Sequence, residues 1–97
     1  IVQCNWRYGH RDIDIIAANG DMLVFVDVKT RRNNMFTDPE MAVDYQKIRS
    51  LSIAANAFIK QYRINADIRF DVITIVGSED NFEINHIEDA FLPIPCR

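Results

Sequence analysis

The feature that most constrains the fold is a pair of strand-like runs on either side of a turn signal. Residues 12–18 (DIDIIAA) precede Asn19-Gly20-Asp21, and residues 22–29 (MLVFVDVK) follow it. Asparagine and glycine tolerate the positive φ angles that tight hairpin turns require, and the second run is rich in β-branched and aromatic residues. The sequence therefore predicts a β-hairpin. Because residues 23–26 are all apolar, we expect its second strand to be central and covered on both faces.

The remaining elements follow from periodicity. From Tyr45 to Tyr62 apolar residues recur at spacings of three and four, which predicts an amphipathic helix. Residues 37–40 carry a helix-start signal, and Asp44 offers a second N-cap. Residues 30–37 are read as a polar loop, and the tail with Pro93 and Pro95 as extended. Further strands are predicted at residues 1–7, 69–76 and 82–87, the last at a sheet edge. The expected order is β-β-β-α-β-β, in one domain over residues 1–97 that is truncated at its N-terminus.

Composition narrows the class of protein. Almost half of the 97 residues are hydrophobic, yet no apolar run reaches the roughly 18 to 20 residues that a membrane helix needs, so no membrane partner is expected. Cys4 and Cys96 form no CxxC pair and no zinc spacing. Two reduced thiols are typical of a cytoplasmic protein. His10 and His86 have no partner at ligand spacing and are read as ordinary surface or edge residues.

The net charge of −3 argues against a nucleic-acid partner, but the charge distribution argues for one. Acidic residues are in excess after Arg63, whereas the segments before it are rich in cations, so that one end of the molecule suits phosphate. Plain solvation of the surface explains the same charges. The candidate phosphate contacts are Arg7, Arg11, Arg31, Arg32 and Lys47, with Gln46 as an accessory residue.

Two further observations bear on a nucleic-acid partner. Lys47 falls in the first turn of the predicted helix, where the helix dipole disfavours a cation, which indicates an anion nearby. Trp6 and Tyr8 flank Arg7 and offer stacking surfaces for bases. Packing of Trp6 in the core beside the sheet is the alternative.

The charges inside the predicted hairpin are the most informative residues. Asp27 and Lys29 are two residues apart and share one strand face, as do Asp12 and Asp14 on the partner strand. If Gly20 and Asp21 are the central turn residues, Asp14 lies opposite Asp27. If Asn19 and Gly20 are the central turn residues, Asp12 lies opposite Asp27. Either register puts the acids of both strands on the face of Lys29.

Opposed like charges destabilise a sheet, and burial of unpaired carboxylates costs several kcal/mol per ion. A divalent cation would compensate, since carboxylate oxygens are preferred ligands of Mg²⁺. Such a metal would activate a water and Lys29 would stabilise the developing charge, as phosphodiester hydrolysis requires. A salt-bridge cluster of Asp27, Lys29 and an aspartate explains the same residues without a metal.

The run NWRYGHRDIDIIAANGDMLVFVDVKTRR (residues 5–32) resembles the YraN-like uncharacterised family of the restriction-endonuclease-like superfamily, named for its PD-(D/E)XK signature. Residues 39–43 with Lys47, residues 69–76 (RFDVITIV) and residues 84–91 (INHIEDAF) also fit. The resemblance covers nearly the whole chain. It implies an α/β (α+β) fold, a mixed sheet flanked by helices in the order α-β-β-β-α-β. The family's opening helix is absent here, and its loss would expose a sheet face and favour a homodimer.

The resemblance also implies roles for the hairpin charges. Asp14 would be the first-motif aspartate and a metal ligand, Asp27 the second ligand and Lys29 the catalytic lysine. Asp27 stands where the family more usually has Glu. Asp12 likewise replaces a Glu and would be a second acid behind the ligands. The implied function is an Mg²⁺- or Mn²⁺-dependent nuclease acting on nucleic acid, DNA more than RNA. A nucleic-acid-binding module without turnover and a structural or interaction domain are the alternatives.

Overall fold

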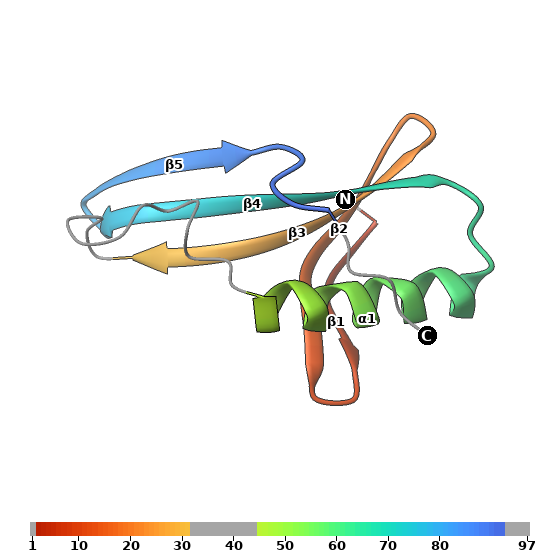
Figure 1. The fold of residues 1–97 in the computed structure, drawn as a ribbon. Helices are drawn as coiled ribbons and strands as arrows, with labels where there is room; N and C mark the ends of the chain where they lie inside the picture. The colour runs from red at the N-terminus through yellow and green to blue at the C-terminus, as the bar shows by residue number, and fades with distance from the viewer. Residues whose placement is uncertain (1, 32–44, 93–97) are drawn as a thin grey trace.

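A sheet of five strands with one helix along a face makes up the part of the chain that the computed structural model describes, residues 2–31 and 45–92 (Figure 1). The order of elements confirms the prediction. They are β1 (Gln3–Tyr8), β2 (Arg11–Asn19), β3 (Met22–Arg31), α1 (Tyr45–Tyr62), β4 (Asp67–Ser78) and β5 (Asn81–Ile87).

The strands follow one another across the sheet in the order β1-β2-β3-β4-β5. All neighbours are antiparallel except β3 and β4, which are parallel and are joined through α1. Parallel strands need such a crossover because a tight turn only reverses the chain. The fold is therefore α+β with a mixed sheet, as expected, and is consistent with a restriction-endonuclease-like core. The predicted central strand is β3, in which residues 23–26 are all buried.

The turn between β2 and β3 fixes the register of the predicted hairpin. Asn19 lies opposite Met22, which makes Gly20 and Asp21 the two central turn residues. Gly20 has a φ of 63°, and a glycine at the first central position suits a two-residue hairpin turn. The first of the two registers considered above is thus confirmed. The register that places Asp12 opposite Asp27 is wrong.

The alternation of side chains between the two faces of β2 is interrupted at Asp14. Ile13 and Ile16 are both fully buried in the same core cluster, although an ideal strand sends residues of opposite parity to opposite faces. On β1, Asn5 lies between the partners of Ile13 and Ile15 and has a φ of 52°, so both strands are distorted at this level. The β1–β2 hairpin consequently crosses the long strands β3, β4 and β5 at a steep angle (Figure 1).

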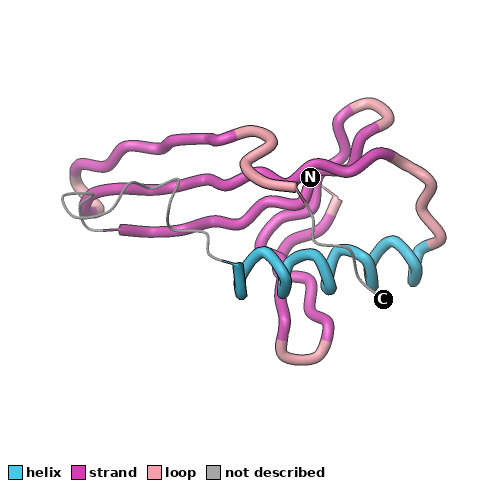
Figure 2. Tube along the Cα trace, in the orientation of Figure 1, coloured by secondary structure: helices cyan, strands magenta, loops and turns pink. Residues whose placement is uncertain are grey.

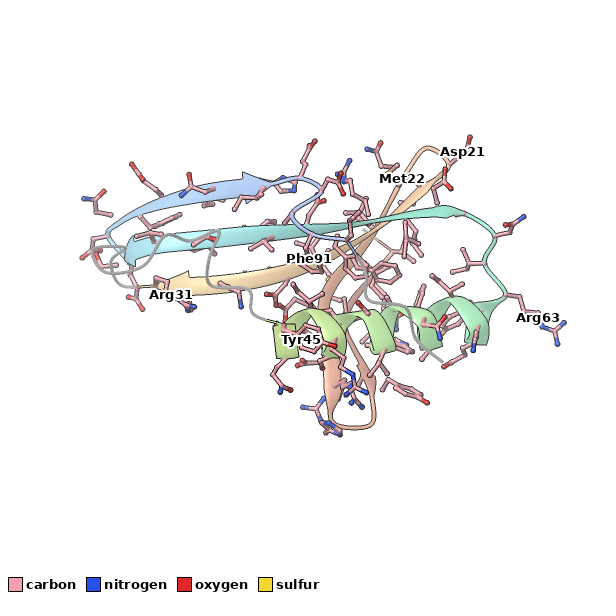
Figure 3. All side chains as sticks on the ribbon, viewed as in Figure 1. Asp21, Met22, Arg31, Tyr45, Arg63 and Phe91 are labelled. Carbon is pink, nitrogen blue, oxygen red and sulfur yellow. The ribbon has the colours of Figure 1, made fainter. Side chains whose placement is uncertain are left out.

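α1 runs along one face of the sheet (Figure 2). It buries an aromatic core against that face. Phe58 meets Trp6 and Phe25 edge-on at ring-centroid distances of 5.2 and 6.0 Å. Phe25 stacks on Phe70, which in turn stacks on Phe91, a residue that lies between the sheet and the helix (Figure 3). Edge-on and offset contacts of this kind are the favoured aromatic geometries. This helix-covered side of the sheet is called the helix face below.

One strand is longer than the sequence predicts, and several predictions concern residues that the structure does not describe. The sequence predicts a loop at Thr30 and Arg31, but these residues continue β3 because Ile75 and Val76 of β4 pair with them. The helix-start signal at residues 37–40, Asp44, Arg32, Cys96 and the proline tail lie outside the described residues. Within residues 2–31 and 45–92, no helix is long and apolar enough to cross a membrane.

Candidate active site

Asp27 is a buried carboxylate on the helix face of the central strand. It is two residues from Phe25 of the core, so the strand alternation turns it toward α1, and it is only 3% exposed. Lys29, two residues further on the same face, places its Nζ 3.1 Å from Asp27 Oδ2. The predicted pairing of these two residues on one face is present in the structure.

Lys47 reaches the same carboxylate from the first turn of α1. Its Nζ lies 3.6 Å from Asp27 Oδ1. The first turn of this helix contains no acidic residue, so Asp27 supplies the anion that a cation at a helix N-terminus calls for. Asp27 is thus an anion near Lys47, as the sequence indicates, and Lys47 lies within the site itself. A contact of Lys47 with phosphate stays a prediction.

Asp14 enters the site at the point where β2 parts from β3. The backbone ladder between these strands ends at the pair Ile15 and Val26. One residue further, Asp14 Oδ2 accepts a hydrogen bond of 2.7 Å from the backbone N–H of Val28. The side chain thereby satisfies a strand donor that the departing backbone leaves unpaired.

The surroundings of Asp14 favour its protonated form. Burial raises the pKa of Asp14, the Val28 N–H lowers it, and the negative charges of Asp27 and Asp12 raise it again. The positive charge of Lys47 lowers it less, so that the pKa lies above its ordinary value. Asp14 and Asp27 are therefore close enough to repel each other, as the opposed register implies.

One oxygen of Asp27 is left without a hydrogen bond. Asp27 Oδ2 is buried and accepts none from the described residues, because the nearby Lys29 ammonium approaches at 3.1 Å without the alignment that a hydrogen bond requires. The Lys29 ammonium offsets part of the cost of burying this oxygen, which lacks the hydrogen bond that buried polar groups almost always have.

A second buried aspartate, Asp71, differs from Asp27 in the hydrogen bonding of its carboxylate. It lies on the other face of β4, is 1% exposed, and both of its oxygens are satisfied. Arg69 donates from Nε to Oδ1 at 2.8 Å and from Nη2 to Oδ2 at 2.9 Å. The Asp89 N–H donates to Oδ1 at 3.0 Å, and His86 Nε2 lies 2.7 Å from Oδ2. The sequence-based predictions do not include this cluster, although Arg69 and Asp71 have the same spacing of two as Asp27 and Lys29.

The other predicted site residues lie around the cluster rather than in it. Asp12 is exposed and sits opposite Arg7 on β1, so it influences Asp14 through its charge only. Gln46 and Arg7 are exposed. Arg31 is exposed at the end of β3, where its Nη1 donates to the Thr30 carbonyl at 3.0 Å. Arg11 is half-buried opposite Tyr8 near the tip of the β1–β2 hairpin.

The donor set is limited to two carboxylates. In the described part of the chain, no three side chains of the types His, Cys, Asp and Glu gather closely enough to hold a metal by themselves. Two carboxylates still suit Mg²⁺, which keeps several waters and completes its shell with substrate phosphates. The orphaned Asp27 oxygen and the repulsion between the two acids fit such an ion.

Fold and site together define an α+β protein whose central strand carries an aspartate–lysine cluster beneath the first turn of its helix. The sequence comparisons agree on one family. Residues 1–75 match the uncharacterised protein family UPF0102, and the chain belongs to this family, the YraN-like group that the sequence resembles.

Relatives in the same family are similar over most of their length. A UPF0102 protein of Bacteroides thetaiotaomicron is 49% identical over 89 residues, which cover 92% of this chain and 74% of the relative. One from Parabacteroides distasonis is 43% identical over 97 residues, which cover 100% and 79%. One from Christiangramia forsetii is 35% identical over 91 residues, which cover 94% and 76%. Their names assign no activity.

Proposed function

We propose that this protein is a nuclease that hydrolyses phosphodiester bonds in nucleic acid with the help of a divalent metal ion, Mg²⁺ or Mn²⁺. The observation that carries the proposal is the state of Asp27. The same sheet buries two aspartates, and Asp71 is fully hydrogen-bonded whereas Asp27 keeps a buried oxygen without a hydrogen bond. That oxygen has the Lys29 ammonium as an ion-pair partner at 3.1 Å but accepts no hydrogen bond among the described residues, which favours a metal ion beside it.

Asp14 and Asp27 would hold the ion, and it would supply the activation of a water and the neutralisation of phosphate charge. Asp27 is fixed by burial in the central strand, and Asp14 by its hydrogen bond to the Val28 N–H. Both proposed ligands would therefore be held in position by contacts within the sheet, as catalytic geometry requires.

The lysines would act on the charge that develops during hydrolysis. Lys29, whose side chain is 13% exposed, would donate from Nζ to the attacking oxygen or to a phosphate oxygen. Lys47 is more exposed, at 38%, and would meet the phosphate at the outer side of the site. Arg7, Arg11 and Arg31 would bind flanking phosphates. The same role is proposed for Arg32, which lies outside the described residues. Gln46 would be an accessory contact, and Asp12 would add a negative charge behind Asp14.

The test is cleavage of labelled single-stranded, duplex and branched DNA, and of RNA, in Mg²⁺ or Mn²⁺ and in EDTA. We expect cleavage that requires the metal, and a loss of about 10²- to 10³-fold in Lys29→Met. Asp27→Asn should abolish both cleavage and the rise in melting temperature that the metal produces. Asp67→Asn is the matched control, because Asp67 is an exposed aspartate at the start of β4. Absence of metal-dependent stabilisation and of cleavage on every substrate would refute the proposal.

One observation favours a second candidate, a nucleic-acid-binding module without turnover. Lys29 and Lys47 both lie within 4 Å of Asp27, so two lysines already balance the charge of two aspartates. Salt-dependent binding without cleavage would identify this module. If the protein neither binds nor cleaves nucleic acid and the metal does not change its stability, the remaining function is that of a structural or interaction domain.

A further inference from the structure

The tip of the β1–β2 hairpin carries an aromatic ring that is fixed in place and yet exposed. Tyr8 is 48% exposed and lies parallel to Trp6, with an interplanar angle of 5° and ring centroids 6.3 Å apart. Trp6 is 7% exposed and is held edge-on by Phe58 of the core. The core thereby sets the orientation of Tyr8 through Trp6, while half of the tyrosine remains open to solvent.

The guanidinium of Arg11 stands beside this ring. Arg11 lies directly opposite Tyr8 in the strand ladder, so the two side chains share one face. Among the described residues, no carboxylate pairs with its guanidinium, and its buried Nε has no hydrogen bond. A half-buried guanidinium in this state favours an incoming anion.

The ring and the cation belong to the side of the sheet that carries the aspartates. Trp6, opposite Ile13, packs into the core beneath α1, and Asp27 meets Lys47 of the same helix. Arg11 is three residues before Asp14 on β2, which corresponds to about 10 Å along a strand. At the spacing of about 3.4 Å per nucleotide of a stacked strand, roughly three nucleotides cover that distance.

An aromatic face beside a phosphate-binding cation is how proteins hold unpaired bases, because a base in a continuous duplex has no free face to stack. We propose that Tyr8 is the stacking platform for an unpaired base and that Arg11 neutralises an adjoining phosphate. This proposal deepens the proposed function and rests on it, and it names the substrate class: a strand with unpaired nucleotides next to the cleaved bond.

The test measures binding in EDTA, so it does not depend on turnover. Fluorescence anisotropy with labelled oligo(dT), oligo(U) and a blunt DNA duplex compares the wild type with Tyr8→Ala and Tyr8→Phe. We expect Tyr8→Ala to weaken single-strand binding about 5- to 100-fold and to leave duplex binding unchanged. Tyr8→Phe keeps the ring and should bind like the wild type. The two single strands distinguish DNA from RNA as the source of the base.

The chain offers matched controls for both residues. Tyr62 is 49% exposed and also contacts Phe58, but it ends α1, about 22 Å along the helix from Lys47. Tyr62→Ala should therefore leave binding unchanged. Arg11→Gln should lower the salt dependence of single-strand binding by about one phosphate contact, and Lys60→Gln near the end of α1 should not. Trp6 is the single tryptophan, so a base that stacks on Tyr8 should change its fluorescence.

The outcomes separate the two proposals. Equal single-strand binding by the wild type and a folded Tyr8→Ala variant would overturn the platform, and so would an equal loss on the duplex. If the Tyr8 effect appears but no substrate is cleaved in Mg²⁺ or Mn²⁺, the platform stands and the nuclease proposal fails. If cleavage occurs and Tyr8→Ala cuts single-stranded and duplex substrates like the wild type, the platform alone fails.

Discussion

The carboxylate of Asp14 accepts a hydrogen bond from the backbone N–H of Val28, one residue beyond Asp27. The ladder between β2 and β3 ends one residue earlier, so a side chain takes over from the backbone at the point where β2 bends away. The bend and the hydrogen bond together bring Asp14 to the carboxylate of Asp27. One residue thus has a structural role as well as a proposed catalytic one.

Two substitutions separate these roles of Asp14. Asp14→Asn keeps a side-chain oxygen for the Val28 N–H, whereas Asp14→Ala leaves that donor without an acceptor. We expect the alanine variant to be less stable than the asparagine variant by about 1–3 kcal/mol, measured by urea unfolding in EDTA. Both variants should lose stabilisation by Mg²⁺ or Mn²⁺. Equal stability of the two would contradict the structural role.

Lys29 should contribute to the stability of the fold because its partner Asp27 is buried. Lys29→Met removes the ammonium 3.1 Å from a carboxylate that is 3% exposed, so we expect a loss of about 3 kcal/mol or more in unfolding free energy. The double variant Asp27→Asn/Lys29→Met should recover most of it, because no buried charge remains. A double-mutant cycle measures the coupling. Lys60→Met, at the exposed end of α1, serves as the control, and additive single effects would speak against the pairing.

Asp71 should make stability depend on pH. Burial raises the pKa of Asp71, but the hydrogen bonds from Arg69, the Asp89 N–H and His86 together lower it by more. The folded-state pKa therefore lies below its ordinary value of 3.8. A depressed carboxyl pKa contributes stability that is present above 3.8 and is lost as pH falls through the folded-state pKa.

Asp71→Asn therefore tests this contribution directly. We expect the variant to be less stable than the wild type at pH 7 by about 1.5–3 kcal/mol, which lowers the melting temperature by several degrees. The difference should shrink when both proteins are compared below about pH 4. Thermal unfolding across this range checks it, and a difference that stays constant down to pH 2 would count against the ionised cluster.

Gly77 should tolerate substitution less well than Gly20. A Cβ on Gly77 would lie 2.3 Å from the Asn81 carbonyl oxygen, and its φ of 125° is strained for any other residue. Gly20 also has a positive φ, but a Cβ there meets nothing within 4 Å. We expect Gly20→Ala to cost about 1 kcal/mol and Gly77→Ala clearly more, because the β4–β5 hairpin must open. Urea unfolding of both variants ranks them, and the reverse order would be inconsistent with the close approach.

Most of the fold was predictable because its causes are local. The Asn19-Gly20-Asp21 turn predicted the β2–β3 hairpin but left two registers open, alternation and β-branched residues marked the strands, and the predicted helix from Tyr45 to Tyr62 is present as α1. The pairing of Asp27 with Lys29 was also predictable, since residues two apart on a strand share a face.

The tertiary structure alone decided the rest. Lys47 lies twenty residues from Asp27 in sequence, and only the docking of α1 brings them together. The bend at Asp14 depends on where β2 leaves β3. Asp71 gains His86 from β5 and the Asp89 N–H from the segment after β5. Periodicity reports which face a side chain takes within its own element. It carries no information on which distant group will meet that side chain there, because that depends on how the elements pack.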